Sequence, residues 1–106
     1  MINESQKVPL NELSLRMRRF KNEMSKAHPD WEIVIIFSKI NLYYFTGTMQ
    51  EGMLLIPREE DEILWVRRSF DRAVDESLFP QIRPMESYRD VVGTIKLPET
   101  CYIEAE

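Results

Sequence analysis

The side chains of this sequence that could perform chemistry are few and stand far apart. The 106 residues include a single histidine, His28, and a single cysteine, Cys101. A zinc site needs several Cys or His ligands at defined spacing, and a serine nucleophile needs a base such as histidine beside it. The sequence offers neither arrangement. We therefore interpret His28, next to Pro29, as a surface turn residue and Cys101 as a buried structural thiol.

Carboxylates are the more abundant candidates, with 18 Asp and Glu residues. One group, residues 59–62, lies where a turn between two strands is expected, and charges there keep a strand edge from pairing with other chains. A second group, Asp71, Asp75 and Glu76, shares a predicted helix with Arg72 and is interpreted as a solvated face. Neither group has the ligand spacing of a calcium loop. We predict no metal ligand and no catalytic residue in this chain, so a hydrolase built on two carboxylates is the least favoured hypothesis.

Length and charge narrow the class of protein. A chain of 106 residues fits one domain, residues 1–106. The net charge is −4 and the pI is about 5.1, whereas a nucleic-acid surface needs a concentrated basic face. We interpret the basic cluster within residues 16–21 as a solvated helix face. The three glycines, Gly47, Gly52 and Gly93, are too scattered to form a phosphate-binding loop.

The sequence predicts a cytoplasmic protein. A single cysteine suits a reducing compartment, and the polar residues 1–7 lack the apolar core of a signal peptide. No stretch approaches the roughly 18 apolar residues of a membrane-spanning helix. We expect neither a membrane nor a nucleic acid as a partner.

Apolar spacing predicts how the chain opens. A stripe at helical spacing predicts a helix that begins near Pro9 and ends at residues 28–30, with the charged residues between its members facing water. The stripe consists of Leu13, Met17, Phe20, Met24 and Ala27. The nearly continuous apolar run of residues 31–37 predicts a central strand that is covered on both faces.

The rest of the chain alternates between short helices and strands. We expect a brief helix over residues 41–47 that ends at Gly47, then a hairpin over residues 53–66 with a charged turn at 58–62. A helix over residues 68–78 would have Ser69 as its cap and Phe70, Ala73, Val74 and Leu78 on its inner face. A strand over 81–84, a helix opened by the capping box Ser87–Asp90 and continuing to Ile95, and a strand over 101–104 complete an α/β pattern.

The segment Asn41-Leu42-Tyr43-Tyr44-Phe45-Thr46-Gly47 is similar to the signature stretch of the creatinase/prolidase N-terminal domain. The family motif residues are Asn41, Tyr44, Thr46 and Gly47. The order of elements around them also resembles the family, roughly from Leu10 to Glu104. The resemblance implies an α/β fold of the ribonuclease-H-like type, a mixed β-sheet flanked by helices.

What the resemblance implies for activity lies largely outside this chain. Members of the family carry a C-terminal pita-bread domain, in which Asp, Asp, His, Glu and Glu hold two divalent metal ions (Mn, Co or Zn) that cleave Xaa-Pro bonds. We expect this chain to be a fragment that lacks that domain and contains no cofactor of its own. Its expected partners are its own C-terminal catalytic domain and a second copy in a homodimer.

The resemblance also suggests which residues serve the parent protein. Tyr44, Thr46 and Met49 would form part of a substrate-pocket wall, and Arg67 or Arg68 could pair with a substrate carboxylate. Alternatively, Tyr44 and Phe45 belong to the core, and the two arginines are solvent-exposed residues at a helix start.

We thus expect a non-catalytic N-terminal domain of an Xaa-Pro dipeptidase or aminopeptidase that contributes pocket wall and dimer contacts. The alternatives are a stand-alone protein-interaction module and the corresponding domain of a creatinase-type amidinohydrolase.

Overall fold

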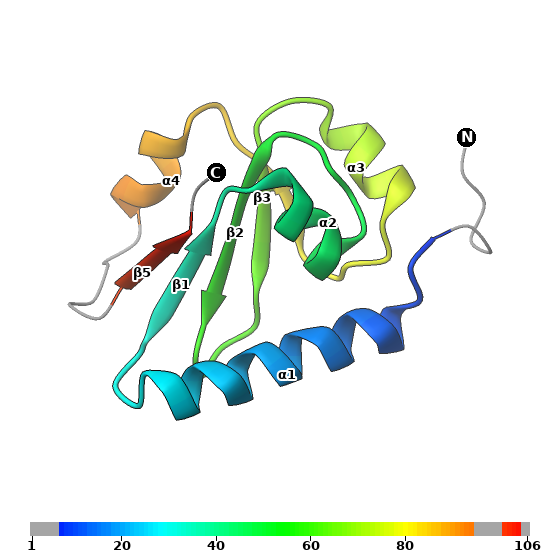
Figure 1. Ribbon diagram of the computed structural model, residues 1–106. Coiled ribbons are helices and arrows are strands. Elements are labelled where there is room, and N and C mark those ends of the chain that lie inside the picture. The colour runs from blue at the N-terminus through cyan, green and yellow to red at the C-terminus, as the bar shows by residue number, and fades with distance from the viewer. Residues whose placement is uncertain (1–6, 95–100, 105–106) are drawn as a thin grey trace.

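The computed structural model describes residues 7–94 and 101–104 (Figure 1). Within these residues the elements follow one another as helix, strand, helix, two strands, helix, strand, helix and strand. They are α1 (Leu10–Ala27), β1 (Ile33–Ile36), α2 (Lys39–Thr46), β2 (Gly52–Pro57), β3 (Ile63–Val66), α3 (Phe70–Glu76), β4 (Ile82–Pro84), α4 (Tyr88–Thr94) and β5 (Cys101–Glu104). The predicted order of elements is confirmed, with boundaries shifted by a few residues.

The strands form one mixed sheet in the order β4-β3-β2-β1-β5. Strand β2 is antiparallel to both β1 and β3, whereas β5 runs parallel to β1 and β4 runs parallel to β3. The predicted hairpin is the β2–β3 pair. The ribonuclease-H-like mixed sheet flanked by helices is therefore confirmed.

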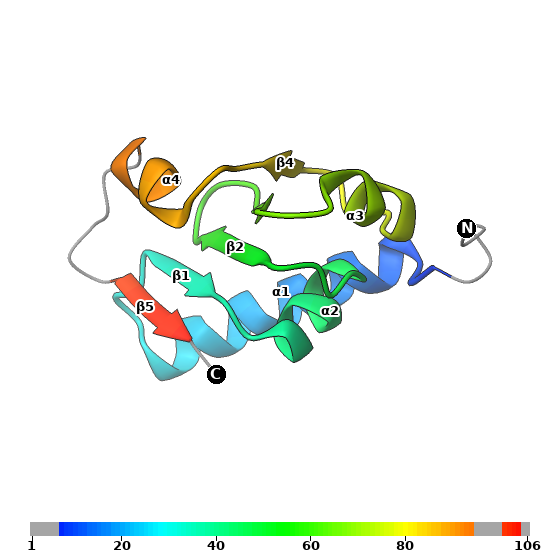
Figure 2. The ribbon, with the colours of Figure 1, turned by 90° about the horizontal axis from the view of Figure 1, so that it is seen from above.

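Figure 2 shows α1 and α4 on opposite sides of strand β1, and side chains on both faces of the sheet are buried. On one face, Val34 and Ile36 of β1 join a core cluster with residues of α1, α2 and α3. On the other face, Ile33 and Ile35 pack with Val91 of α4. All four residues of β1 are buried, as the continuous apolar run predicts. Trp31 is fully buried but precedes the strand, so the predicted strand over 31–37 was too long.

Helix α1 begins directly after Pro9 and places Leu13 and Met17 in the core. Phe20 and Met24 pack against the same cluster. The predicted stripe ends there, because Ala27 is exposed in the last turn.

The prediction for the third helix, over residues 68–78, was partly wrong. Helix α3 ends at Glu76 and buries Ala73, but Val74 is 48% exposed. Ser69 occupies the N-cap position as predicted, yet its backbone is left-handed (φ 57°, ψ 42°) and its side chain makes no capping hydrogen bond. A normal cap has an extended backbone that aims the hydroxyl at the first turn, and this geometry prevents it.

Helix α4 begins as its capping box predicts. Ser87 Oγ accepts a hydrogen bond from the Asp90 backbone N–H at 3.2 Å. Ile95, the predicted end of this helix, lies outside the described residues. Among the described residues, no helix is both long enough and apolar enough to cross a membrane.

Candidate functional site

The family motif lies in α2 and the turn that follows it. Gly47 ends the helix in a left-handed conformation (φ 83°), and its N–H donates to Tyr43 O at 2.8 Å. This backbone conformation strains residues with a Cβ, which explains the glycine. A Cβ at Gly47 would lie 3.7 Å from Val8, so the segment before α1 covers the turn.

Thr46 is fully buried and ties the turn to its surroundings. Its Oγ1 donates to Leu42 O at 2.6 Å, one turn back in the helix. Its carbonyl accepts a short hydrogen bond from Ser77 Oγ, which in turn accepts from the Phe79 N–H at 2.9 Å. Thr46 is therefore buried in the interior, where it joins α2 to the segment after α3.

Asn41 connects the start of α2 to the last strand. Its side-chain amide donates to Glu104 Oε2 at 2.8 Å, and the Ser38 N–H donates to Glu104 Oε1 at 3.3 Å. Ser38, the N-cap residue, makes no side-chain capping bond of its own. Glu104 therefore supplies a negative group at the helix N-terminus, which is where a carboxylate is favourable.

Tyr44 and Phe45 differ, although both could have belonged to the core. Phe45 is buried, and its ring contacts that of Phe20 edge-on. Tyr44 is 43% exposed and lies under the Arg16 guanidinium, 4.7 Å from the ring centroid. Arg16 also donates to Tyr44 O at 2.8 Å. Arg16, predicted to face water, instead joins α1 to α2.

Beside the glycine turn is a hollow of about 210 Å³, here named the Gly47 pocket. Met49 and Tyr43, both about half exposed, form part of its wall. Glu76 also lines it and accepts hydrogen bonds from Thr48 Oγ1 at 2.8 Å and from Gln50 Nε2 at 3.1 Å. Of the predicted wall residues, Met49 lines this pocket, whereas Tyr44 and Thr46 do not.

The two arginines lie elsewhere. Arg67 pairs with Glu51 at 3.0 Å, and its N–H donates to Glu51 O at 2.9 Å. Arg68 is exposed. Burial raises the pKa of the nearby Tyr88 phenol, and the Glu51 carboxylate adds to that rise. Neither arginine lines the Gly47 pocket, so the structure does not bring the predicted residues together in one hollow.

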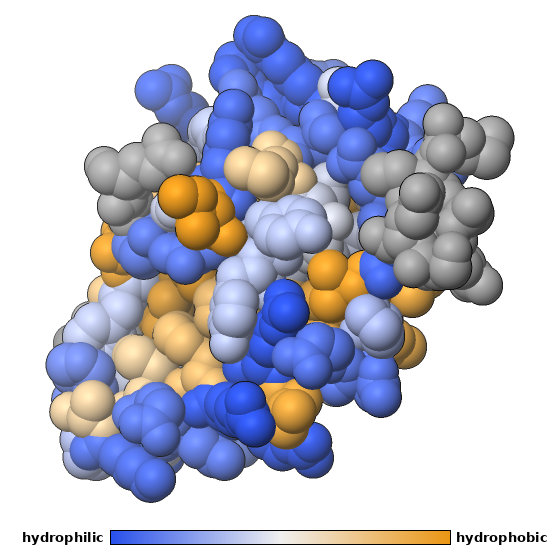
Figure 3. All heavy atoms as spheres, turned by 45° about the vertical axis from the view of Figure 1, so that its right-hand side comes forward, coloured by the Kyte–Doolittle hydropathy of each residue, from blue (hydrophilic) through white to orange (hydrophobic). Residues whose placement is uncertain are grey.

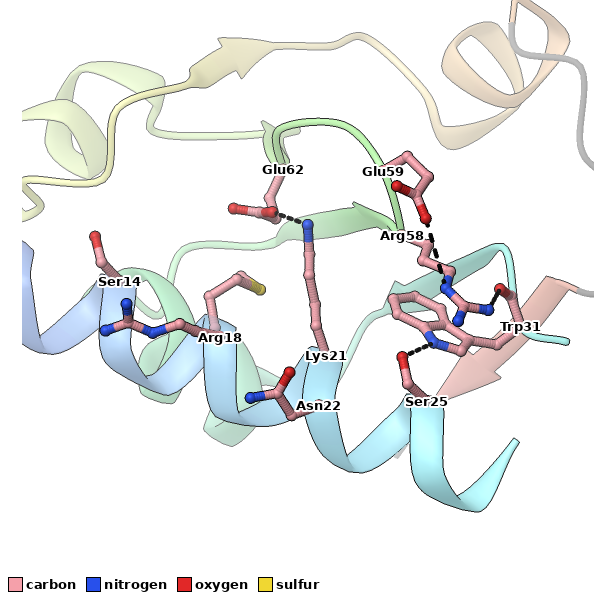
Figure 4. A pocket seen from close by; sticks show the side chains of 10 residues that line it. Ser14, Arg18, Lys21, Asn22, Ser25, Trp31, Arg58, Glu59 and Glu62 are labelled. Atoms are coloured by element: carbon pink, nitrogen blue, oxygen red, sulfur yellow. Dashed lines mark hydrogen bonds and ion pairs between the residues drawn. The ribbon is translucent and has the colours of Figure 1, made fainter. Parts of the chain in front are cut away.

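A second hollow, of about 460 Å³, lies between α1 and the turn that joins β2 to β3 (Figure 4). We name it the α1–hairpin groove. Lys21 extends from α1 to Glu62, 2.6 Å away, and also donates to Glu60 O at 3.1 Å. Lys21 was predicted to face water, but its ammonium group binds the charged turn and its side chain is only 23% exposed. It thereby joins this turn to α1.

The floor of the α1–hairpin groove is Trp31, whose indole N–H donates to Ser25 Oγ at 3.0 Å. Arg58 donates to Pro29 O at 2.7 Å and to Trp31 O at 3.2 Å, with its guanidinium 5.9 Å from the Trp31 ring centroid. No motif in the sequence pointed to this groove, because its residues come from three separate segments.

Cys101 and His28 remain outside both hollows. Cys101, predicted to be buried, is only partly buried, and this burial raises the pKa of its thiol. His28 is exposed, and its ring lies 4.7 Å from that of Tyr102. Within residues 7–94 and 101–104, no three His, Cys, Asp or Glu side chains lie close enough to hold a metal ion.

Comparisons with known proteins agree on one family. Residues 16–99 match the family model described as the creatinase/prolidase N-terminal domain. The structure is similar to prolidase from Pyrococcus furiosus, with a TM-score of 0.70 and 25% identity over 84% of this chain and 28% of that one. For prolidase from Pyrococcus horikoshii OT3 the TM-score is 0.72 and the identity 21%, over 87% and 26% of the two chains.

A structure of domain length is also similar. The creatinase/prolidase N-terminal domain of an X-Pro dipeptidase from Streptococcus pyogenes gives a TM-score of 0.64 and 17% identity, over 85% of this chain and 76% of that one. No curated protein matches the sequence. The chain spans little more than a quarter of the two Pyrococcus prolidases.

Proposed function

The chain belongs to the creatinase/prolidase N-terminal domain family, and we propose that it forms a non-catalytic wall of the substrate pocket in an Xaa-Pro dipeptidase or aminopeptidase. In this proposal the domain also provides dimer contacts. The two divalent metal ions (Mn, Co or Zn) would be bound by a C-terminal catalytic domain. Solved structures of similar shape include a prolidase, a proline dipeptidase and an Xaa-Pro aminopeptidase, which supports this choice of parent activity.

The observation that carries the proposal is the exposed surface of α2 and the glycine turn. Four large side chains there are between 43% and 73% exposed, namely Ile40, Tyr43, Tyr44 and Met49. Figure 3 shows this side of the molecule, where apolar and weakly polar surface lies between charged surface above and below. Exposed aromatic and apolar side chains grouped in this way are typical of a surface that another domain or a ligand covers.

Hydrogen bonds hold the scaffold beneath this surface at three points, and a pocket wall requires such support. Asn41 fixes the start of α2 to β5, Thr46 fixes its end to the segment after α3, and Arg16 fixes its middle to α1. A wall held at three points keeps a peptide in a defined position relative to metal ions. In this proposal Asn41, Thr46 and Gly47 of the family motif hold α2 in place, while the exposed side chains of this surface make the contacts.

The test uses the full-length product of the gene, assayed for hydrolysis of Xaa-Pro dipeptides with added Mn or Co. Met49→Ala and Tyr43→Ala should raise KM severalfold with a smaller change in kcat. Val74→Ala, a matched change of an exposed apolar residue on α3, should alter neither. Unchanged kinetics in all three variants would contradict the pocket-wall role.

Two related functions share the same surface and would be recognised by the same experiment. A full-length product that hydrolyses creatine rather than Xaa-Pro dipeptides would be a creatinase-type amidinohydrolase. A product without a metal-binding domain would leave a stand-alone interaction module, whose partner would cover α2. Light scattering on the purified product tests the proposed homodimer.

A further inference from the structure

We propose that the Gly47 pocket binds a primary ammonium group on an apolar stem and that Glu76 is the residue that pairs with it. The proposal concerns the isolated chain and does not depend on the parent activity. It rests on the hydrogen bonding of Glu76, on the charge around it and on the shape of the pocket.

Hydrogen bonds orient the carboxylate of Glu76, but they reach only one of its two oxygens. Thr48 Oγ1 and Gln50 Nε2 both donate to the same oxygen, Oε1. The other oxygen, Oε2, has no hydrogen-bond partner among the described residues. Two donors fix the orientation of the group without neutralising it, so one oxygen remains for a ligand.

The charge of Glu76 also lacks compensation from the described part of the chain. The ion pairs found there involve other carboxylates: those of Glu12, Glu23, Glu51, Glu59 and Glu62. Glu76 is the last residue of α3, and α2 ends at Gly47 in the same pocket. The C-terminal end of a helix carries partial negative charge, so an acidic residue is unfavourable there and a cation is favourable.

The pocket walls suit an ammonium group that carries an apolar stem. Val8, Tyr43 and Met49 line the hollow of about 210 Å³, which has room for several methylene groups. An aromatic ring attracts a cation over its face. A guanidinium group would fit less well, because its paired N–H groups match both oxygens of a carboxylate and Glu76 has only one available.

Among the described residues, Lys7 is the one cation that lines the pocket. It forms no ion pair with Glu76 in the structure as described, so the carboxylate is open to an external cation. The ammonium group could be the free N-terminus of a peptide or the side chain of a lysine on a partner. Both share the chemistry that the pocket recognises.

The test is a titration of the 106-residue chain followed by ¹H–¹⁵N spectra. The ligands are Ala-Pro amide with a free N-terminus, Nα-acetyl-lysine amide, and Nα-acetyl-norleucine amide as the neutral control. The first two should shift the signals of Gly47, Thr48 and Gln50 with millimolar affinity, and the neutral control should bind about tenfold more weakly or not at all. Raising the salt concentration should weaken binding of the charged ligands.

Variants locate the site. Glu76→Gln keeps an acceptor for Thr48 and Gln50 but removes the charge, and should weaken ammonium binding about tenfold. Glu86→Gln, an exposed control outside the pocket, should leave binding unchanged. Tighter binding of the dipeptide amide would identify a peptide N-terminus as the ligand, and tighter binding of the lysine amide would identify a partner side chain.

Equal binding of the norleucine and lysine amides would overturn the proposal, and this comparison requires only the unmodified chain. Unchanged affinity in Glu76→Gln would overturn it as well, as would ligand-induced shifts confined to another part of the domain.

Discussion

The α1–hairpin groove and the Gly47 pocket differ in how their charges are satisfied. In the α1–hairpin groove, Lys21 neutralises Glu62, and Arg58 is bonded to two backbone carbonyls. In the Gly47 pocket, Glu76 accepts hydrogen bonds from two neutral donors and forms no ion pair with any described residue. The groove is the larger of these two hollows by volume, yet its residues Lys21, Glu62 and Arg58 are occupied by contacts within the chain.

Size alone therefore does not identify a binding site. A charge that is paired inside the chain contributes to stability, and a ligand would have to compete for it. A charge that is oriented by neutral donors has no opposite charge within the described residues to neutralise it, so it remains available to a charged ligand.

The largest effect is expected in β2, which begins two residues after Gln50 of the pocket and ends next to Arg58 of the groove. A Cβ on Gly52, the first residue of β2, would lie 2.1 Å from Trp65 O. Because that neighbour is backbone, Gly52→Ala should lower the free energy of unfolding by about 3 kcal/mol or more, measured by urea denaturation. Gly93→Ala is the control, since nothing lies within 4 Å of its added methyl, and in helix α4 it should stabilise by about 0.5–1 kcal/mol. Similar losses in the two variants would contradict this account.

The next largest effect is a loss of stability that distinguishes an ion pair in the groove from an ion pair on the solvated surface. Lys21→Met leaves Glu62, whose side chain is only 19% exposed, without its cation, and should cost about 1–2 kcal/mol of unfolding free energy. The matched change Lys26→Met removes an ion pair with Glu23 that is 3.7 Å long and 76% exposed on both sides. That variant should change stability by less than about 0.5 kcal/mol. A negligible loss of stability in Lys21→Met would show that this ion pair does not hold the β2–β3 turn against α1.

A smaller loss of stability is expected when the link between α2 and β5 is broken. This link bears on the pocket, because α2 forms one of its walls. Asn41→Ala and Glu104→Ala each break the link between α2 and β5, and each should cost about 1 kcal/mol. The double variant should cost less than the sum of the two, with a coupling of about 0.5–1 kcal/mol. Asn22→Ala, an exposed change on α1, is the control. Fully additive costs at Asn41 and Glu104 would show that the two side chains act independently.

The sequence predicted the elements well because their signals are local. The stripe in α1, the continuous apolar run of β1 and the capping box at Ser87 each depend on neighbours within a few residues. The glycine at 47 predicted the end of α2 for the same reason. The class of fold followed from the order of these elements.

The contacts of the site could not be predicted, because they join residues that are distant in sequence. Asn41 and Glu104 are 63 positions apart, and Thr48 and Glu76 are 28 apart. Patterning assigned Lys21 to water, since it cannot reveal that the charged turn folds back onto α1. It also placed Val74 on the inner face of its helix, although α3 is too short to have a settled apolar stripe. Patterning cannot decide whether Tyr44 lies in the core or in a contact surface, because its exposure depends on the position of Arg16.

The most direct test of the central claim compares Glu62→Gln with Glu76→Gln by urea denaturation at low and high salt. Both variants remove one negative charge and keep the size and an acceptor oxygen. We predict that Glu62→Gln lowers the unfolding free energy by about 1 kcal/mol at low salt and by less at high salt, whereas Glu76→Gln leaves it unchanged or slightly higher. A loss of stability in Glu76→Gln as large as that in Glu62→Gln would show that the charge of Glu76 is already compensated within the chain, and the contrast between the two hollows would fail.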